Sequence, residues 1–108
     1  MALEIYLEST PNPESLKFVT SKLLLPNILI DNRKGEDTKD FPLAKGLYEK
    51  FDWISGVFVS NNFVTITKNT VDDWYEHMHE VKGYLQMYIE NNLEIVSKEF
   101  LDEKYKPK

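Results

Sequence analysis

Cysteine is absent from this chain of 108 residues. Without thiolates the chain cannot form a disulfide bond, use a cysteine nucleophile, or hold zinc or an iron–sulfur cluster through sulfur. Glycine is scarce as well, and the four glycines form neither a phosphate-binding loop nor a dinucleotide-binding fingerprint. The sequence therefore excludes thiol-based chemistry and offers no nucleotide-binding motif.

Positive charge is in deficit, since thirteen Lys and Arg face eighteen Asp and Glu, for a formal net charge of −5. This balance opposes binding to a polyphosphate backbone, so we expect no nucleic-acid partner. No apolar run approaches the length of a membrane span. The start, MALEIYLES, lacks the basic flank of a secretory signal. We therefore expect a cytoplasmic protein with no membrane partner.

The length allows one small domain, and its first part has the period-two alternation of β-strands. Residues 3–8 and 16–19 are predicted strands, each with one buried face. Thr10-Pro11-Asn12-Pro13 joins them, and the fixed φ angles of its prolines predict a stiff link that is not helical. Residues 27–31 are a weaker strand candidate, and residues 32–40 are expected to be a polar loop.

A short helix is predicted next, in DFPLAKGLYEKF. Asp40 is its candidate N-cap and Pro42 suits its first turn. Its apolar residues recur at one-face spacing, namely Ala44, Leu47, Tyr48 and Phe51. Residues 56–68 are then predicted to form a β-hairpin that turns at Asn61-Asn62, because asparagine tolerates the positive φ of tight hairpin turns.

The longest periodic stretch runs from Asp72 to Asn92 and predicts a second helix. Its apolar stripe consists of Trp74, Met78, Val81, Leu85 and Tyr88. Thr70 and Asp73 resemble a capping box at its start. The order of elements (strand, strand, helix, hairpin, long helix) predicts an α+β fold, in which two helices pack on a small, mainly antiparallel sheet. The segment after the second helix is expected either to dock locally or to begin a linker.

The titratable residues give little sign of a catalytic or metal site. His77 and His79 are two positions apart on the predicted helix, so their side chains point in nearly opposite directions and cannot hold one metal ion. Glu76, His79 and Glu80 share a face and are minor candidates for a divalent metal site. Solvated charge on the outer face of the helix is the favoured interpretation. No serine has a nucleophile-elbow context, so we expect no enzyme.

Two tryptophans are candidates for contact with a partner. Trp74 lies on the apolar stripe and is expected in the core. Trp53 follows the first predicted helix and has no periodic role, which leaves its exposure open. An exposed tryptophan there would anchor a partner well, although ordinary packing is the favoured interpretation.

Four stretches appear in a definite order: TPNPESLKF, FPLAKGLY, NNFVTITK, and an acid-rich entry to the helix that contains Trp74. In kind, order and approximate spacing they resemble the N-terminal domain of the Nfu (NifU-like) iron–sulfur cluster proteins, over about Leu3 to Asn92. The chain departs from the family at Trp53-Ile54, where Gly-Val is common. The resemblance implies a domain of residues 1–92, followed at 93–108 by a tail or the start of a linker.

Members of that family usually continue into a domain whose Cys-x-x-Cys motif holds a bridging iron–sulfur cluster, commonly 4Fe-4S. The resemblance therefore implies a non-catalytic accessory domain in iron–sulfur cluster biogenesis, which binds no cofactor itself. It would recognise cluster donors, client apo-proteins or a Cys-bearing domain. Thr10-Pro11-Asn12-Pro13 and Trp53 are the candidate partner contacts, although for the proline link a structural role as a stiff turn is the favoured interpretation. A standalone interaction module outside cluster handling and a weak direct iron binder are the alternatives. A monomer is expected, since no long heptad pattern is present.

Overall fold

The structure is a computed structural model that describes residues 3–69 and 73–104. Within these residues five antiparallel strands form one sheet in the order β1-β2-β5-β4-β3. The strands are β1 (Ile5–Ser9), β2 (Ser15–Thr20), β3 (Leu25–Arg33), β4 (Ile54–Asn61) and β5 (Phe63–Lys68). The helices are α1 (Pro42–Lys50), α2 (Trp74–Glu90) and α3 (Lys98–Lys104).

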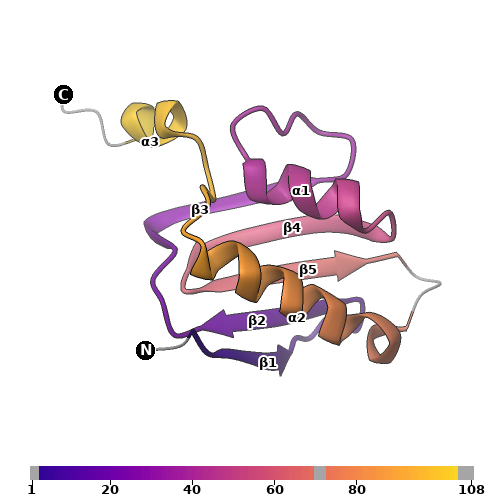
Figure 1. Ribbon diagram of the computed structural model, residues 1–108. Coiled ribbons are helices and arrows are strands. Elements are labelled where there is room, and N and C mark those ends of the chain that lie inside the picture. Colours follow the sequence, from indigo (N-terminus) through magenta and orange to yellow (C-terminus); the bar gives the residue numbers. More distant parts are fainter. Residues whose placement is uncertain (1–2, 70–72, 105–108) are drawn as a thin grey trace.

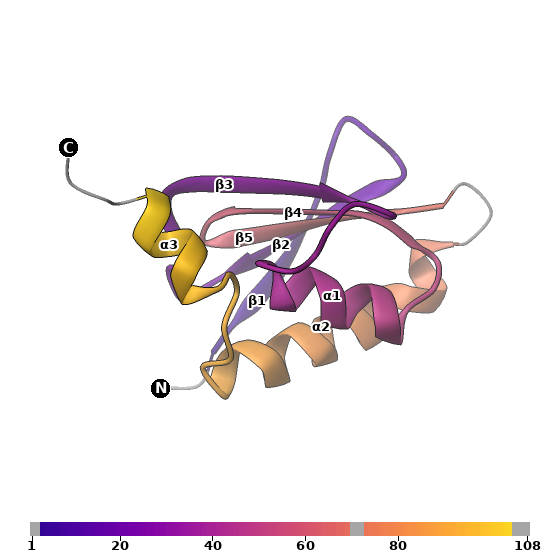
Figure 2. The ribbon, with the colours of Figure 1, turned by 90° about the horizontal axis from the view of Figure 1, so that it is seen from above.

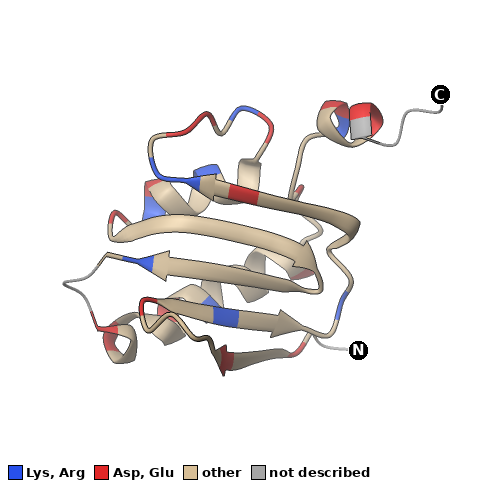
Figure 3. Cartoon of the chain, turned by 180° about the vertical axis from the view of Figure 1, so that it is seen from behind, with Lys and Arg blue, Asp and Glu red and all other residues tan. Residues whose placement is uncertain are grey.

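The elements form two layers, because α1 and α2 lie on the same face of the sheet (Figures 1 and 2). The opposite face is covered by none of the described helices (Figure 3). An antiparallel sheet tolerates this arrangement, since one of its faces can pack on the core while the other faces water. The predicted α+β fold, with helices on one face of a mainly antiparallel sheet, is confirmed.

Strand β3 is longer than the sequence predicts, because Asn32 and Arg33 belong to the strand and not to the expected polar loop. The side chain of Asn32 is 3% exposed. Its amide nitrogen donates to the carbonyl oxygen of Asp37 at 3.1 Å, and the Tyr48 hydroxyl of α1 donates to the Asn32 carbonyl at 2.7 Å. These hydrogen bonds, one to the following loop and one from α1, stabilise a buried polar residue that periodicity assigns to a loop.

The predicted N-cap of α1 is wrong. Phe41 occupies the N-cap position and makes no side-chain cap. Asp40 is instead tied to the far end of the chain: its carboxylate accepts from the Ser97 hydroxyl at 2.7 Å, and its carbonyl accepts from the Ser97 amide at 2.8 Å. A proline in the first turn lowers the need for a cap, since its missing N–H is one of the donors that a cap would satisfy.

At the start of α2 the N-cap is Asp73, whose side chain accepts from the Tyr75 amide at 2.9 Å. Thr70, the other half of the expected capping box, lies outside the described residues. The hairpin turn is confirmed, since Asn61 has a φ of 46° and β4 pairs with β5 on either side of it. The polar signal at Asn61 therefore located the hairpin turn correctly, whereas the capping box placed Asp73 three residues inside the helix and the structure has it as the N-cap.

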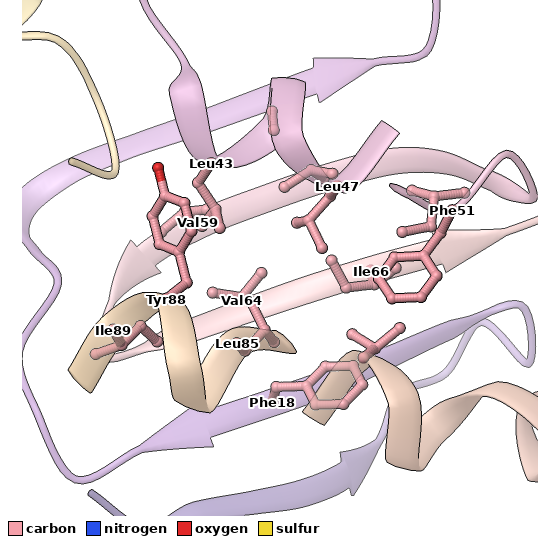
Figure 4. Close-up of a cluster of buried hydrophobic side chains, with 14 of the residues drawn as sticks. Phe18, Leu43, Leu47, Phe51, Val59, Val64, Ile66, Leu85, Tyr88 and Ile89 are labelled. Carbon is pink, nitrogen blue, oxygen red and sulfur yellow. The ribbon is translucent and has the colours of Figure 1, made fainter. Parts of the chain in front are cut away.

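The core lies between the sheet and the two helices (Figure 4). Phe18, Leu43, Leu47, Ile66 and Leu85 contribute side chains with no exposed surface. Burying each such side chain contributes about 1.5–3 kcal/mol relative to exposure. The predicted stripe of α2 is confirmed in this core, with four of its members buried and Met78 half-buried.

The segment that follows α2 packs on this domain. Val96 is 3% exposed and belongs to the core cluster. The Phe100 ring of α3 meets the Phe41 ring edge to face, with centroids 5.2 Å apart. The Tyr88 hydroxyl of α2 donates to the Glu94 carbonyl, and burial raises the pKa of Tyr88 to about 12, so this donor stays protonated at a pH where an exposed tyrosine would ionise. The sequence left open whether the segment after α2 docks on the domain or begins a linker. Residues 93–104 dock on the domain.

Gly46 of α1 allows close contact with α2. A Cβ at this position would lie 2.3 Å from the Tyr84 hydroxyl oxygen. Alanine has the better helix propensity by about 1 kcal/mol, but the Tyr84 ring must move to admit the methyl group. We therefore expect Gly46→Ala to lower the free energy of unfolding by about 1–2 kcal/mol, measured by urea denaturation.

Gly83 of α2 is the matched control, because among the described residues no atom other than those of its chain neighbours and the backbone of its own helix lies within 4 Å of the position of its Cβ. Gly83→Ala is expected to raise the free energy of unfolding by about 1 kcal/mol through helix propensity alone. Combining Gly46→Ala with Tyr84→Phe should recover much of the lost stability. Equal stabilisation by the two alanine variants would show that the contact between Gly46 and Tyr84 is absent in solution.

Candidate functional site

The link between β1 and β2, Thr10-Pro11-Asn12-Pro13, projects from one end of the sheet. Pro11, Asn12 and Pro13 are all exposed, and Thr10 is half-buried beneath them. Both prolines fix their own φ angle and restrict the preceding residue to extended conformations. The sequence signal for a stiff link therefore corresponds to a stiff, outward-facing turn.

Hydrogen bonds within the turn restrict it further. The Thr10 hydroxyl donates to the Asn12 carbonyl at 2.8 Å, and the Asn12 amide donates back to the Thr10 oxygen at 3.2 Å. The Asn12 side chain accepts from the Glu14 amide at 3.0 Å, which is an Asx turn, and the Asn12 carbonyl also accepts from the Ser15 amide at 3.0 Å. Little conformational freedom is left for a partner to remove.

Neighbouring elements hold the turn from below through Glu14. Its carbonyl accepts from the Lys68 amide at 2.9 Å and from the Trp74 indole nitrogen at 3.1 Å. The hydroxyls of Ser15 and Thr67 lie 2.7 Å apart and join β2 to β5 at the same level. The turn is thus attached both to the sheet and to the first residue of α2.

The structure places Trp53 in the core and not on the surface. Its side chain is 7% exposed, and its ring meets the Trp74 ring edge to face, with centroids 5.4 Å apart. The His77 ring stacks on it with a centroid separation of 4.1 Å. Trp53 as a direct partner anchor is therefore a wrong interpretation, because a ring covered on these sides is not available to a partner. Trp53 supports the turn indirectly, through Trp74.

Tyr75 is a candidate contact that sequence reasoning missed. It follows Trp74 in the first turn of α2 and is 84% exposed. The bond from Trp74 to Glu14 brings the start of α2 to the Pro-Asn-Pro turn, and both lie at the same end of the molecule (Figure 1). The sequence does contain a signal for its exposure, because Tyr75 is an aromatic residue that does not belong to the apolar stripe of α2. We call Pro11, Asn12, Pro13 and Tyr75 the turn surface.

The minor metal candidates Glu76, His79 and Glu80 are all exposed on α2. Across residues 3–69 and 73–104, no group of three or more His, Asp or Glu side chains is placed to hold a metal ion. The prediction that the two histidines diverge is confirmed, since His77 stacks on Trp53 whereas His79 faces solvent. In the same part of the chain, no helix has the length and hydropathy that crossing a membrane requires.

A protein-family model matches most of the chain. The family described as "Scaffold protein Nfu/NifU N terminal" matches residues 5–92. The NifU-like protein C1709.19c of Schizosaccharomyces pombe is 28% identical over 94 residues, covering 85% of this chain and 36% of that protein. The human protein named NFU1 iron-sulfur cluster scaffold homolog, mitochondrial, is 28% identical over 96 residues, covering 88% and 37%. The chain thus spans little more than a third of the length of these relatives.

Two solved structures have the same fold. The solution structure of a NifU-like protein from Saccharomyces cerevisiae superposes with a TM-score of 0.78, covering 90% of this chain and 87% of that one. The crystal structure of protein SAV1430 from Staphylococcus aureus superposes with a TM-score of 0.60, covering 77% and 96%. Both are 19% identical to this chain, so these likenesses show the fold alone.

Proposed function

Because the chain belongs to the family of Nfu/NifU scaffold N-terminal domains, we propose that it is a non-catalytic accessory domain in iron–sulfur cluster biogenesis. In this proposal it binds cluster donors, client apo-proteins or a Cys-x-x-Cys domain and directs delivery of the cluster. The cluster is the cargo of those proteins, since this chain has no cysteine to hold it. A cytoplasmic location stays a prediction, and several relatives are named mitochondrial.

The turn surface is the observation that supports this proposal most. Its three turn residues are exposed, hydrogen bonds of Thr10 and Asn12 restrict the turn, and Tyr75 adds an exposed aromatic ring at the start of α2, at the same end of the molecule. Binding to a preorganised surface costs little conformational entropy, and tyrosine is enriched among the residues that dominate binding energy. The net charge of −5 would also steer basic partners toward the chain.

The proposal is tested by titrating the nitrogen-15-labelled chain with a Cys-x-x-Cys domain encoded in the same genome, and separately with ferrous iron. We expect the Cys-x-x-Cys domain to shift the amide signals of residues 10–15 and of Tyr75, and iron to shift none. If neither the Cys-x-x-Cys domain nor cluster donors shift any amide signal, the recognition role is contradicted. Iron-dependent shifts from Glu76 to Glu80 would instead support the direct iron binder.

A matched pair of variants separates the turn surface from exposed aromatic surface in general. Tyr75→Ala is expected to weaken binding of the Cys-x-x-Cys domain about tenfold, because the ring contributes contact area at the rigid turn. Tyr6→Ala removes another exposed tyrosine, which lies on β1 with 58% of its side chain accessible, and should leave binding unchanged. Isothermal titration calorimetry measures both, and equal effects would argue against the turn surface.

The standalone interaction module remains the second candidate. It requires the same turn surface but a partner outside cluster handling, because one fold can serve unrelated functions. Binding of the turn surface to a protein with no part in cluster assembly, without effect on cluster transfer, would favour it.

A further inference from the structure

A hollow of about 590 Å³ lies at the other end of α2 from the turn surface. Three segments meet there: the start of the chain, the connection between β2 and β3, and the last turn of α2 (Figure 1). Leu3 and Ile89 are its apolar lining. A second hollow of about 230 Å³ adjoins the first and shares Lys22, Ile89 and Asn92 with it. The two together form one groove, which we call the leucine groove.

Most residues that line the second hollow are apolar, namely Leu23, Leu24, Leu93, Ile95 and the shared Ile89, although polar atoms contribute nearly half of its exposed surface. Leu23 is 57% exposed and Leu93 is 47% exposed, and both line the same hollow as other apolar residues. Isolated exposed leucines are common on protein surfaces, but a contiguous apolar groove with polar residues at its rim is typical of interaction sites. The leucine groove therefore has the composition of a docking site for apolar side chains.

The charges around the leucine groove indicate the chemistry of the partner. Glu4 and Glu90 both line the first hollow. The last turn of α2 carries no basic residue of its own, and Lys22, which reaches Asn92 just after the helix, partly offsets the negative end of the helix dipole. Lys22 is the sole cation that lines either hollow among the described residues, and it donates to the Asn92 side chain at 2.5 Å. This electronegative rim attracts lysine and arginine.

We propose that the leucine groove binds a basic amphipathic helix of a partner protein. The two hollows adjoin, and side chains one helical turn apart lie roughly 5–6 Å from each other, so one apolar face can fill both hollows. Lysine or arginine beside that face meets Glu4 and Glu90. The site is separate from the turn surface, since α2 with its 17 residues is about 25 Å long, and both sites can be occupied together.

The test uses the chain with a fluorescein-labelled peptide of alanine, leucine and lysine as the probe. The peptide has about 15 residues, the length at which isolated helices become stable, with leucines on one face and lysines beside them. Fluorescence anisotropy should show saturable binding of this peptide, and at least tenfold weaker binding of the same peptide with glutamate in place of lysine. Glu90→Lys, at an exposed position, should weaken binding of the basic peptide and strengthen binding of the acidic one.

Leucine variants complete the test. Leu23→Ser with Leu93→Ser is expected to reduce affinity for the basic peptide by tenfold or more. Leu29→Ser is the matched control, because Leu29 is 62% exposed on β3 outside the leucine groove and should not affect binding. Absence of saturable binding, equal binding of both peptides, or equal loss in the Leu29 variant would overturn the proposal. So would a dimer in analytical ultracentrifugation that the two groove substitutions dissociate, since the occupant would then be a second copy.

Discussion

Trp74→Ala is expected to lower the free energy of unfolding by about 3–5 kcal/mol, the range for removing a buried tryptophan. The Trp74 ring is 8% exposed and meets both Phe18 and Trp53 edge to face, with centroids 6.0 and 5.4 Å away. Its indole nitrogen also donates to the Glu14 carbonyl. The substitution therefore removes packing between the sheet and α2 and one of the attachments of the turn. Urea denaturation followed by circular dichroism measures the change.

Two further variants separate these contributions. Trp74→Phe keeps a ring but removes the donor to Glu14, and is expected to cost about 1–3 kcal/mol and to increase the mobility of residues 10–14. Tyr75→Ala is the control, since this exposed neighbour should change the stability by less than about 0.5 kcal/mol. A Trp74→Ala variant as stable as the Tyr75→Ala variant would contradict the packing described for the start of α2.

Val96→Asp is expected to lower the free energy of unfolding by about 3 kcal/mol or more. Val96 is 3% exposed within the core cluster, so aspartate would place a carboxylate where an apolar side chain is packed, and removing such a charge from water is costly. Lys98→Asp, at an exposed position of α3, is the charged control and should change stability by less than about 0.5 kcal/mol. Thermal denaturation of the unmodified chain and of the two variants compares their midpoint temperatures.

The packing of Val96, Ser97 and Phe100 on the rest of the chain predicts that the domain extends beyond residue 92. Truncation after residue 92, where the family match ends, should destabilise the protein about as much as Val96→Asp, because it also removes the Phe41–Phe100 contact and the bonds of Ser97 to Asp40. A truncated chain with full stability would show that residues 1–92 form a complete domain. The domain boundary after residue 92, which the sequence suggests, stays a prediction that the stability of the truncated chain tests.

The features that sequence reasoning located correctly depend on local chemistry. Proline fixes its own φ at Pro11 and Pro13, and asparagine accepts the positive φ that the hairpin turn requires at Asn61. The apolar stripe of α2 follows from the helical period. Each signal lies within one element or one turn, so the order of the elements and the α+β class could be predicted.

The features that it missed depend on contacts between distant residues. Asp40 bonds to Ser97, 57 positions later, in place of capping the helix beside it. Trp74 reaches Glu14 across 60 positions, and this contact places the start of α2, which includes Tyr75, at the same end of the molecule as the Pro-Asn-Pro turn. Trp53 has no periodic signal because it lies just before β4, and its burial arises from the rings of α2. None of these partners can be identified from spacing along the chain.

In the proposed function, this chain directs the transfer of an iron–sulfur cluster that another domain holds. The most direct test loads a Cys-x-x-Cys domain with a 4Fe-4S cluster and follows its transfer to a client apo-protein by visible circular dichroism, with and without this chain. We expect the chain to increase the transfer rate, and the Tyr75→Ala variant to increase it less than the Tyr6→Ala variant does. A transfer rate and a client affinity that are the same with and without the chain would contradict the claim.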